Sequence, residues 1–376
     1  MKPIKLLFAL AIGAASFSAM HLTQALAQQP ADWDKVVEAA KKEGEIIVWA
    51  QASDSSRKFW KDAFEKDNPG IKVNLFQPSN TAERDTRVLR EWEAKVLKVD
   101  VFVAGSAGMV ARLKPAGILQ PVKPFLRDDT LDGRNWVGGA PVWVDLEKQY
   151  VMIADLPAGV PAIANESVDI TTIKNWTDLL DPKWDGKIIS LDPRQSGQTY
   201  AFTLFLNASK DLGPDFVRKF FKGGRVVFTN DQRQIAEWVD SGRMMLGFAL
   251  REPEIRSLLS VGSKIKTLPA LMAGGVPQTI TVGSDSALSV ANLNPLPHPN
   301  AVRVYANWIY SKAGQQAMVD ATGLFSTRAD VDTSKLPDRV KQQAGVKYTN
   351  ANDENLNGTE LTKSMRDNVT AAIAEK

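Results

Sequence analysis

The chain has 376 residues, of which 46 are Lys or Arg and 43 are Asp or Glu, and its formal charge is +3. This length exceeds that of one ordinary domain and predicts two, and the hydrophobic share of 44% is that of a globular protein. The absence of Cys excludes disulfides, thiolate metal sites and a Cys nucleophile, the two His exclude a His-rich metal centre, and the nearly balanced charge argues against a nucleic-acid binder.

The N-terminal segment, 1–27, has the pattern of a secretory signal peptide. Two lysines precede an apolar run over 6–20, which is too short to span a bilayer. A small-x-small tripeptide (Ala-Leu-Ala at 25–27) then offers a cleavage site, so that the mature chain would begin at Gln28 with a formal charge of +1 instead of +3. We therefore expect export to the periplasm. The alternative is a buried N-terminal helix.

The first half of the mature chain alternates between helix and strand patterns. Apolar residues at helical spacing predict helices, and short apolar or alternating runs predict strands. In chain order the predicted elements are a helix over 33–42, a strand over 46–50, a helix over 59–64, a strand over 71–75, a helix over 88–96, a strand over 101–104 and a helix over 107–114. This order is typical of βαβ units in a mostly parallel sheet.

The same alternation returns after a Pro- and Gly-containing segment at 155–162. The predicted elements of this half are a strand over 188–191, a helix around 201–205, a strand over 226–228, a helix over 231–239 and a strand over 244–249. A polar tail from about 350 carries one weak amphipathic helix. The sequence therefore predicts two α/β lobes.

The usual enzyme motifs are missing. The sequence has no HExxH and no GxGxxG; a phosphate-binding loop ending at 186–187 would need Gly where Asp181 stands, and a nucleophile elbow at Ser106 would need Gly where Ala104 stands. His298 lies between two prolines, and we expect it to lead into a helix and not to act as a base. We expect no catalytic residue, no cofactor and no metal.

Polar loops follow the predicted strands at their carboxyl ends, where open α/β sheets bind ligands. Ser53, Ser106 and the Ser196-Gly197 pair precede helices, and Arg251 follows the strand over 244–249. Free N–H groups at a helix start form a ready anion site, and Gly lets the backbone approach a ligand. A single Ser of this kind is as well explained as a plain helix cap, but four such loops across two lobes favour a ligand cleft.

Several segments are familiar as a set. They are KKEGEIIVW at 41–49, NPGIKV at 68–73, WTDLLDPKWDGK at 176–187, DP at 192–193, SG at 196–197 and HPNA at 298–301. Together they resemble the family 1 extracellular solute-binding proteins of bacterial ABC importers, in the branch that includes ferric-ion, thiamine and aminoethylphosphonate binders. The resemblance covers nearly all of 33–325.

This resemblance implies the α/β, two-lobe type II periplasmic binding protein fold, in which each lobe is a mixed sheet flanked by helices and the ligand cleft lies between the lobes. It implies that the first lobe comprises 28–150, with 270–325 returning to it, and that the second comprises 151–269, with the tail 326–376 packed on it. The implied function is that of a monomeric receptor that closes on a small-molecule solute. Its implied partners are the permease subunits of an ABC importer, which a cytoplasmic ATPase serves.

The class of ligand follows from which side chains are present. Ferric-binding members of the branch use two adjacent tyrosines, whereas none of the five Tyr here are adjacent, and Tyr200 is followed by Ala201. A Ser- and Thr-rich helix start together with Arg251 favours a carboxylate, phosphonate or phosphate ester. The predicted ligand-binding residues are Ser53, Ser106, Asn165, Arg194, Ser196, Gly197, Thr199, Tyr200 and Arg251.

Four alternatives stay open at this point. A cationic ligand such as thiamine or a polyamine would use carboxylates and aromatic rings, for which Asp54 and Trp49 are candidates. Ferric ion is the second alternative. A secreted hydrolase would consume its ligand, whereas a receptor returns it unchanged. An adhesive surface protein would have no cleft and would not be stabilised by a ligand.

Overall fold

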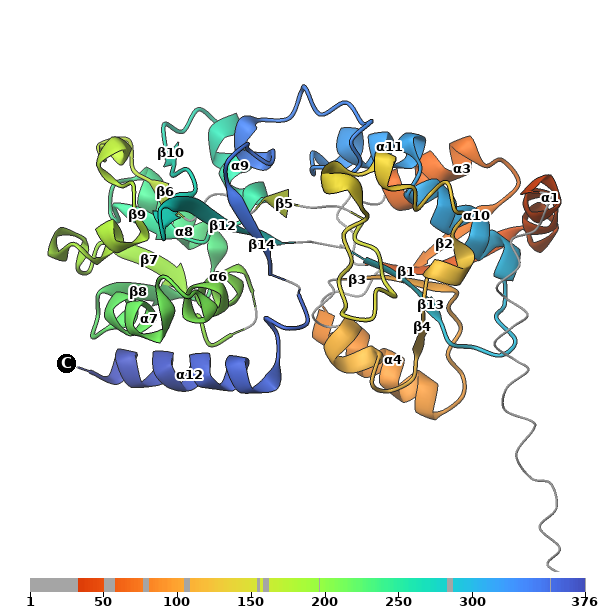
Figure 1. Cartoon of the computed structure of the whole chain (residues 1–376), viewed down its shortest axis with the longest axis horizontal. Coiled ribbons are helices and arrows are strands. Elements are labelled where there is room, and N and C mark those ends of the chain that lie inside the picture. Colours follow the sequence, from red (N-terminus) through yellow and green to blue (C-terminus); the bar gives the residue numbers. More distant parts are fainter. Residues whose placement is uncertain are drawn as a thin grey trace, which may run out of the picture.

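A computed structural model describes residues 33–50, 58–76, 81–104, 109–153, 156–157, 162–195, 197–282, 287–351 and 353–375. Two α/β lobes lie side by side (Figure 1), which confirms the predicted fold class. The predicted signal peptide and three predicted site residues, Ser53, Ser106 and Ser196, lie outside the described residues. Every helix in the described part of the chain is too short or too polar to cross a lipid bilayer.

The first lobe is built on a five-stranded sheet with the order β2-β1-β3-β13-β4. Its strands are β1 (Glu45–Ala50), β2 (Lys72–Phe76), β3 (Val101–Ala104), β4 (Leu119–Gln120) and β13 (Ala287–Ala291). Strand β1 pairs in parallel with β2 and with the central strand β3, and β13 pairs antiparallel with β3. The parallel βαβ start of the sheet agrees with the sequence prediction.

Helices cover both faces of this sheet. They are α1 (Trp33–Glu43), the π-helical η1 (Lys58–Ala63), α3 (Phe64–Asp67), α4 (Thr81–Glu93), the π-helical η2 (Met109–Leu113), the short 3-10 turns η3 (Lys123–Phe125), η4 (Gly133–Asn135) and η5 (Val137–Gly139), α10 (Pro299–Ile309) and α11 (Lys312–Thr322). Ile46 and Val48 belong to the core on one face of the sheet, and Trp49 and Phe102 belong to the core on the other. Burial on both faces explains why β1 is a continuous apolar run.

The second lobe repeats this plan with the sheet order β10-β6-β9-β7-β8. Its strands are β6 (Ala162–Ala164), β7 (Ile188–Leu191), β8 (Val226–Thr229), β9 (Leu246–Phe248) and β10 (Lys266–Thr267). Its helices are α6 (Gln198–Ala208), α7 (Gly213–Phe221), α8 (Gln232–Asp240), α9 (Glu252–Ser260) and α12 (Thr359–Ala374), with the 3-10 turns η6 (Ile170–Thr172), η7 (Trp176–Leu180) and η8 (Pro182–Trp184). Strand β7 is parallel to both β8 and β9, so the carboxyl ends of these three strands share one edge.

A third, smaller sheet joins the lobes. Its strands are β5 (Leu156–Pro157), β11 (Leu271–Ala273), β12 (Val276–Val282) and β14 (Lys347–Asn350). Near the end of β12, Thr281 faces Pro157 of β5 on one side and Asn350 of β14 on the other. The three segments on which the chain passes between the lobes therefore lie hydrogen-bonded side by side.

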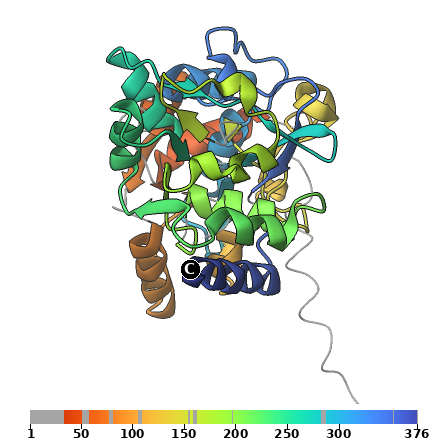
Figure 2. The same ribbon diagram turned by 90° about the vertical axis from the view of Figure 1, so that its left-hand side faces the viewer.

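The lobe boundaries differ from those expected. Leu271 and Ile280 pack in the core of the second lobe, so the chain returns to the first lobe only with β13 and not from residue 270. Val331 and Val340 pack in the core of the first lobe, whereas the expected boundary at 325 placed them in the second. Helix α12, from the end of the same tail, packs against α6 and α7 and lies beside them at the base of the second lobe (Figure 2).

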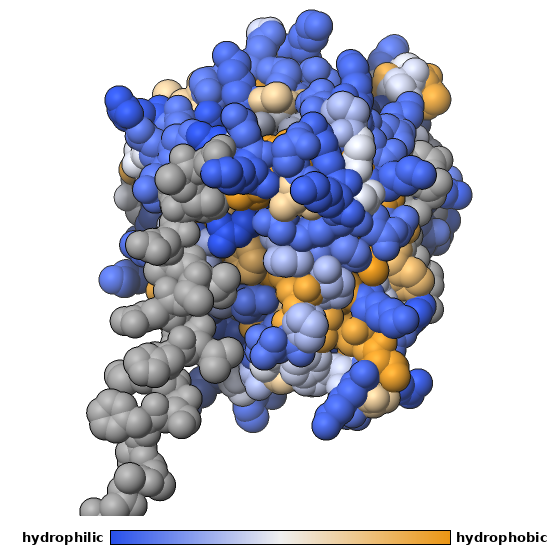
Figure 3. Space-filling model, turned by 90° about the vertical axis from the view of Figure 1, so that its right-hand side faces the viewer, coloured by the Kyte–Doolittle hydropathy of each residue, from blue (hydrophilic) through white to orange (hydrophobic). Residues whose placement is uncertain are grey.

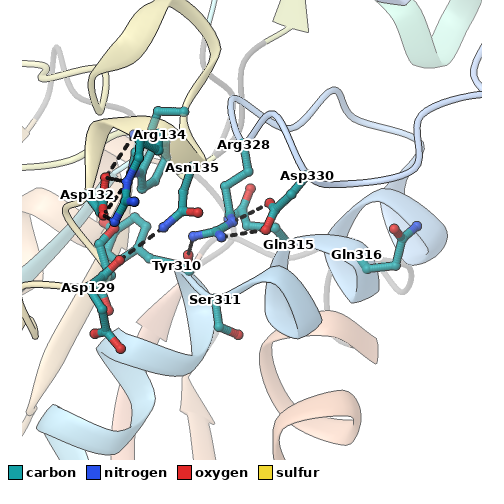
Figure 4. A network of polar contacts seen from close by, with 12 residues as sticks. Asp129, Asp132, Arg134, Asn135, Tyr310, Ser311, Gln315, Gln316, Arg328 and Asp330 are labelled. Carbon is teal, nitrogen blue, oxygen red and sulfur yellow. Dashed lines mark hydrogen bonds and ion pairs between the residues drawn. The ribbon is translucent and has the colours of Figure 1, made fainter.

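A buried arginine fastens the segment after α11 to the first lobe (Figure 4). The Arg328 guanidinium donates from Nε and Nη2 to the two Asp330 carboxylate oxygens, both at 2.8 Å, and from Nη1 to the Tyr310 carbonyl at 2.9 Å. The Ser326 hydroxyl donates to Gln315 Oε1 at 2.7 Å. These buried polar groups are satisfied within the first lobe, which explains why the segment packs there and not on the second lobe.

Several polar contacts between described residues bridge the lobes outside the third sheet, among them that of Arg256 Nη1 with the Thr322 carbonyl at 3.2 Å. Arg339, in the 3-10 turn η9 (Asp338–Val340), donates from Nε and Nη2 to both Glu252 carboxylate oxygens, at 3.0 and 2.8 Å. We call this contact the interlobe ion pair. On the other side the Leu146 N–H donates to Glu354 Oε2 at 3.0 Å.

The outer end of the first lobe carries mostly hydrophilic side chains in its upper half, with apolar ones gathering in the lower half (Figure 3).

Candidate functional site

A cavity of about 670 Å³ opens at the edge of the second lobe where β7, β8 and β9 end. Ligands of open α/β sheets bind at this edge because the helices that follow the strands begin there. Three helices, α6, α8 and α9, begin at the cavity. Its lining consists of Leu191, Gly197, Gln198, Asn230, Asp231, Gln232, Arg233, Ala236, Glu237, Arg251, Glu254, Ser257 and Leu258.

Helix α6 begins at this cavity, and no side chain among the described residues caps its N-terminus. Gly197 precedes the helix with a φ of 153°, a conformation that favours glycine, and it has no side chain that would cap the first turn. The first-turn N–H groups have no acceptor within the helix, and they carry the positive end of the helix dipole. A negatively charged group of a ligand is the natural partner for such a helix start.

The starts of the other two helices are joined by a hydrogen bond from a backbone N–H to a side chain. The Arg251 N–H donates to Gln232 Oε1 at 3.3 Å, so the residue before α9 contacts the first residue of α8. The Arg251 guanidinium pairs with Glu254 in the first turn of α9. The Arg251 side chain remains 56% exposed, and its guanidinium lies at the cavity. We call Gln232, Arg251 and Glu254 the polar cluster.

Among the predicted site residues that the structure describes, Gly197 and Arg251 line the large cavity. Thr199 lines a smaller neighbouring cavity of about 40 Å³. Its side chain is buried and its hydroxyl is hydrogen-bonded to that of Ser190 at 3.2 Å. The Thr199 hydroxyl therefore has a partner inside the lobe, and the backbone N–H of Thr199 is one of the first-turn donors of α6.

Three other predicted site residues have local partners and do not line the large cavity. Arg194 donates to Asp192 two residues earlier, at 2.9 and 2.6 Å, and the guanidinium lowers the pKa of that carboxyl. Asn165 donates from its amide to the carbonyls of Val239 and Asp240 at 2.7 and 3.2 Å, and so satisfies the end of α8.

Tyr200 is the third of these residues. It occupies the third position of α6, and the centroid of its ring lies 5.3 Å from the Arg366 guanidinium carbon of α12. Burial raises the pKa of the Tyr200 phenol. Helix geometry explains the difference from the prediction, because each residue turns the side chain by about 100° around the helix axis.

The sequence prediction missed Gln232 and Glu254. Both belong to the first turn of a helix that directly follows a predicted strand, which is the same signal that selected Ser196 and Arg251. The prediction also missed Asn230 and Asp231, which follow β8 and line the cavity. The Asp231 side chain accepts a hydrogen bond from the Arg233 N–H at 2.8 Å. The loop after β8 was a usable signal in the sequence.

None of the five tyrosines lines the large cavity. Tyr305 and Tyr310 are fully buried in the first lobe, where their hydroxyls donate to the carbonyls of Trp60 and Val151 at 2.9 and 2.7 Å. Burial raises the pKa of both phenols. Within the described ranges, moreover, no three His, Asp or Glu side chains gather into a group that could hold a metal ion.

His298 forms the one His–Asp pair of the described chain. This pair lies at the edge of the first sheet where β3 begins, and not at the edge where the strand ends. Its Nδ1 lies 2.7 Å from Asp100 Oδ2, and its N–H donates to Asp100 Oδ1 at 3.0 Å. Asp100 also accepts from the Ile47 N–H at 2.8 Å, and burial raises the pKa of its carboxyl. Because Asp100 directly precedes β3, this pair lies at the amino ends of the strands and fastens the start of α10, as the sequence predicted for His298.

Comparison with known proteins adds a family and a fold. Residues 60–321 match the sequence profile of a family described as bacterial extracellular solute-binding protein. A search of curated proteins finds no match.

Solved structures of similar fold include three proteins with different ligands in their descriptions. An iron- and citrate-bound protein of Trichodesmium has a TM-score of 0.64 at 17% identity, covering 89% of this chain and 100% of its own. A fructose-6-phosphate-bound protein of Actinobacillus pleuropneumoniae has a TM-score of 0.61 at 15% identity, covering 88% and 98%. A GABA receptor has a TM-score of 0.57 at 14% identity, covering 88% and 98%. At these identities the likeness establishes the fold alone.

Proposed function

Because the chain belongs to the bacterial extracellular solute-binding protein family, we propose that it is the periplasmic receptor of an ABC importer for a small organic anion. The anion would be a carboxylate, a phosphonate or a phosphate ester. The observation that carries this proposal is the uncapped start of α6 beside Arg251 in one cavity at the sheet edge. The receptor acts as a monomer after export, and it hands the unchanged solute to the permease.

The two ends of the proposed site make different contributions. The first-turn N–H groups of α6 bind oxygen atoms of the anion through hydrogen bonds that are aligned with the helix dipole. The Arg251 guanidinium adds a planar, two-pronged donor that matches carboxylate and phosphonate geometry. Arg251 already shares one N–H with Glu254, so the ligand takes up the remaining donors.

Capture requires movement of the lobes in this proposal. The first lobe closes over the solute, and the strands of the third sheet provide the hinge. Closure removes water from the anion and from Arg251, which strengthens the charged hydrogen bonds between them. The permease then distinguishes the closed receptor from the open one.

A cationic solute is the second candidate. Three carboxylates, those of Asp231, Glu237 and Glu254, line the cavity against the two guanidiniums of Arg233 and Arg251. This balance of charge favours a polyamine or thiamine over a simple dianion, because unpaired carboxylates repel a second negative charge.

The test is a thermal-shift screen of the mature protein over organic anions, amines and ferric citrate. The compound that stabilises most is then titrated calorimetrically into wild type, Arg251→Ala and Arg251→Lys. Charged hydrogen bonds contribute about 1.5–3 kcal/mol, so Arg251→Ala should weaken binding of an anion by about tenfold to a hundredfold. Lys should restore only part of this loss.

Arg134→Ala provides the control, because Arg134 is exposed and lies in the first lobe. We expect this variant to bind as wild type does. A cation as the strongest ligand, or equal binding by Arg251→Ala and wild type, would overturn the anion proposal. NMR of the recovered ligand tests the receptor role, because a hydrolase would return a changed compound.

A further inference from the structure

We infer that Gln232 and Glu254 recognise, respectively, a hydrogen-bond acceptor and a hydrogen-bond donor of the solute. The ligand is then an organic anion that also carries an ammonium or hydroxyl group, and not a simple anion. This inference rests on the proposed function, and it names the class of solute more narrowly.

Gln232 lines the cavity, and its side chain carries a buried donor without a partner. Its side chain is 9% exposed, and its Nε2 atom is buried without a hydrogen-bond partner. The orientation of the amide is fixed, because Oε1 accepts from the Arg251 N–H and an amide turned the other way would place two donors against each other. The atom that remains for a ligand is therefore the NH₂ group, which binds an acceptor.

Glu254 presents an unpartnered acceptor at the same cavity. Its Oε1 accepts from the Arg251 guanidinium, whereas its Oε2 is buried without a partner. A carboxylate oxygen is acceptor-only when ionised, so it needs a donor from the ligand. An ammonium group or a hydroxyl group supplies this donor, whereas a second carboxylate or phosphonate oxygen at this place is repelled.

The two unpartnered atoms stand out from the rest of the described chain. Three other buried side-chain atoms have no partner there, Trp60 Nε1, Arg225 Nε and Thr327 Oγ1, and none of these residues lines the cavity. A donor and an acceptor without partners at one cavity, on two helices that Arg251 ties together, form a matched pair of contacts. A buried polar group left without a partner costs free energy, so a solute that satisfies both atoms is favoured over one that satisfies neither.

The experiment compares probes that differ only in the donor group. The carboxylate series is propanoate, 3-hydroxypropanoate and 3-aminopropanoate, and the phosphonate series is ethylphosphonate with its 2-hydroxy and 2-amino derivatives. Each probe is titrated calorimetrically into the mature wild type, Glu254→Gln, Gln232→Leu and the control Glu360→Gln, which changes an exposed residue of α12. Circular dichroism and thermal midpoints verify that each variant is folded.

We expect wild type and the control to bind the hydroxy or amino member of a series at least about tenfold more tightly than the plain member. In Glu254→Gln the ratio of the affinity for the substituted probe to that for the plain probe should fall toward one. The probe whose ratio falls most, amino or hydroxy, identifies the preferred donor. Gln232→Leu should weaken binding throughout the series, because the acceptor on the anion loses its partner.

Equal affinity for plain and substituted probes in wild type would overturn this inference while leaving the organic-anion proposal intact. A ratio that Glu254→Gln leaves unchanged would also overturn it. If none of the six probes binds to wild type, the inference fails together with the carboxylate and phosphonate proposal.

Discussion

The interlobe ion pair is expected to stabilise the fold measurably, because it is both bidentate and largely shielded. Arg339 and Glu252 are 18% and 9% exposed, and two N–H···O bonds of 3.0 and 2.8 Å join them. Their gross attraction at this separation is about 6 kcal/mol at an effective dielectric constant of about 20, and desolvation offsets much of it. Exposed pairs contribute about 0–1 kcal/mol and hydrogen bonds to charged groups about 1.5–3 kcal/mol, so we expect a coupling of about 1.5–3 kcal/mol.

The assay is a double-mutant cycle in urea. The free energies of unfolding of wild type, Glu252→Gln, Arg339→Gln and the double variant give the coupling energy between the two side chains. A second cycle on Lys363 and Asp367 is the matched control, because this pair is 76% and 65% exposed on α12. The control should couple by less than about 0.5 kcal/mol. If the interlobe pair couples no more strongly than the control, the reasoning from burial and geometry is wrong.

Two further predictions concern pH and iron. The Arg328 guanidinium holds the pKa of Asp330 below its ordinary value of 3.8. The ion pair therefore contributes stability that is present above pH 3.8 and is lost as the pH falls through the lowered pKa of the folded state. Thermal midpoints of Asp330→Asn should decline less than those of wild type in this acid range, and parallel declines would contradict the assignment. Because none of the five tyrosines lines the large cavity, titration with ferric citrate should give no phenolate charge-transfer band, and a visible band that Tyr200→Phe abolishes would refute this.

The sequence was most informative about the elements of the two sheets. Strands β1 and β7 were predicted because strands buried on both faces read as short apolar runs, as at 46–50 and 188–191. The lobe boundaries were not predictable in this way, because the local pattern of β12 does not state which sheet it joins. The same holds for Val331 and Val340, because their local pattern does not show that Arg328 fastens this segment to the first lobe through the Tyr310 carbonyl.

The candidate site residues were selected from their position after predicted strands. Gly197 and Arg251, selected in this way, line the same cavity, because the carboxyl ends of parallel strands meet at one edge. Sequence could not show that Arg194 is held by Asp192, or that the Tyr200 ring turns toward α12. It also could not separate Gln232 from an ordinary helix-start residue, since only the three-dimensional packing leaves its Nε2 buried and unpartnered.

The three adjoining strands β5, β12 and β14 have a practical consequence. Ladder hydrogen bonds join them, so any rotation of one lobe against the other has to bend all three together. We therefore expect the lobes to rotate about this group of strands, so that a label on each lobe, attached far from the strands, reports their separation. Because the chain contains no Cys, one engineered pair of cysteines takes fluorescent dyes without background labelling. The protein is in this respect a ready frame for an optical sensor whose energy-transfer signal follows solute concentration.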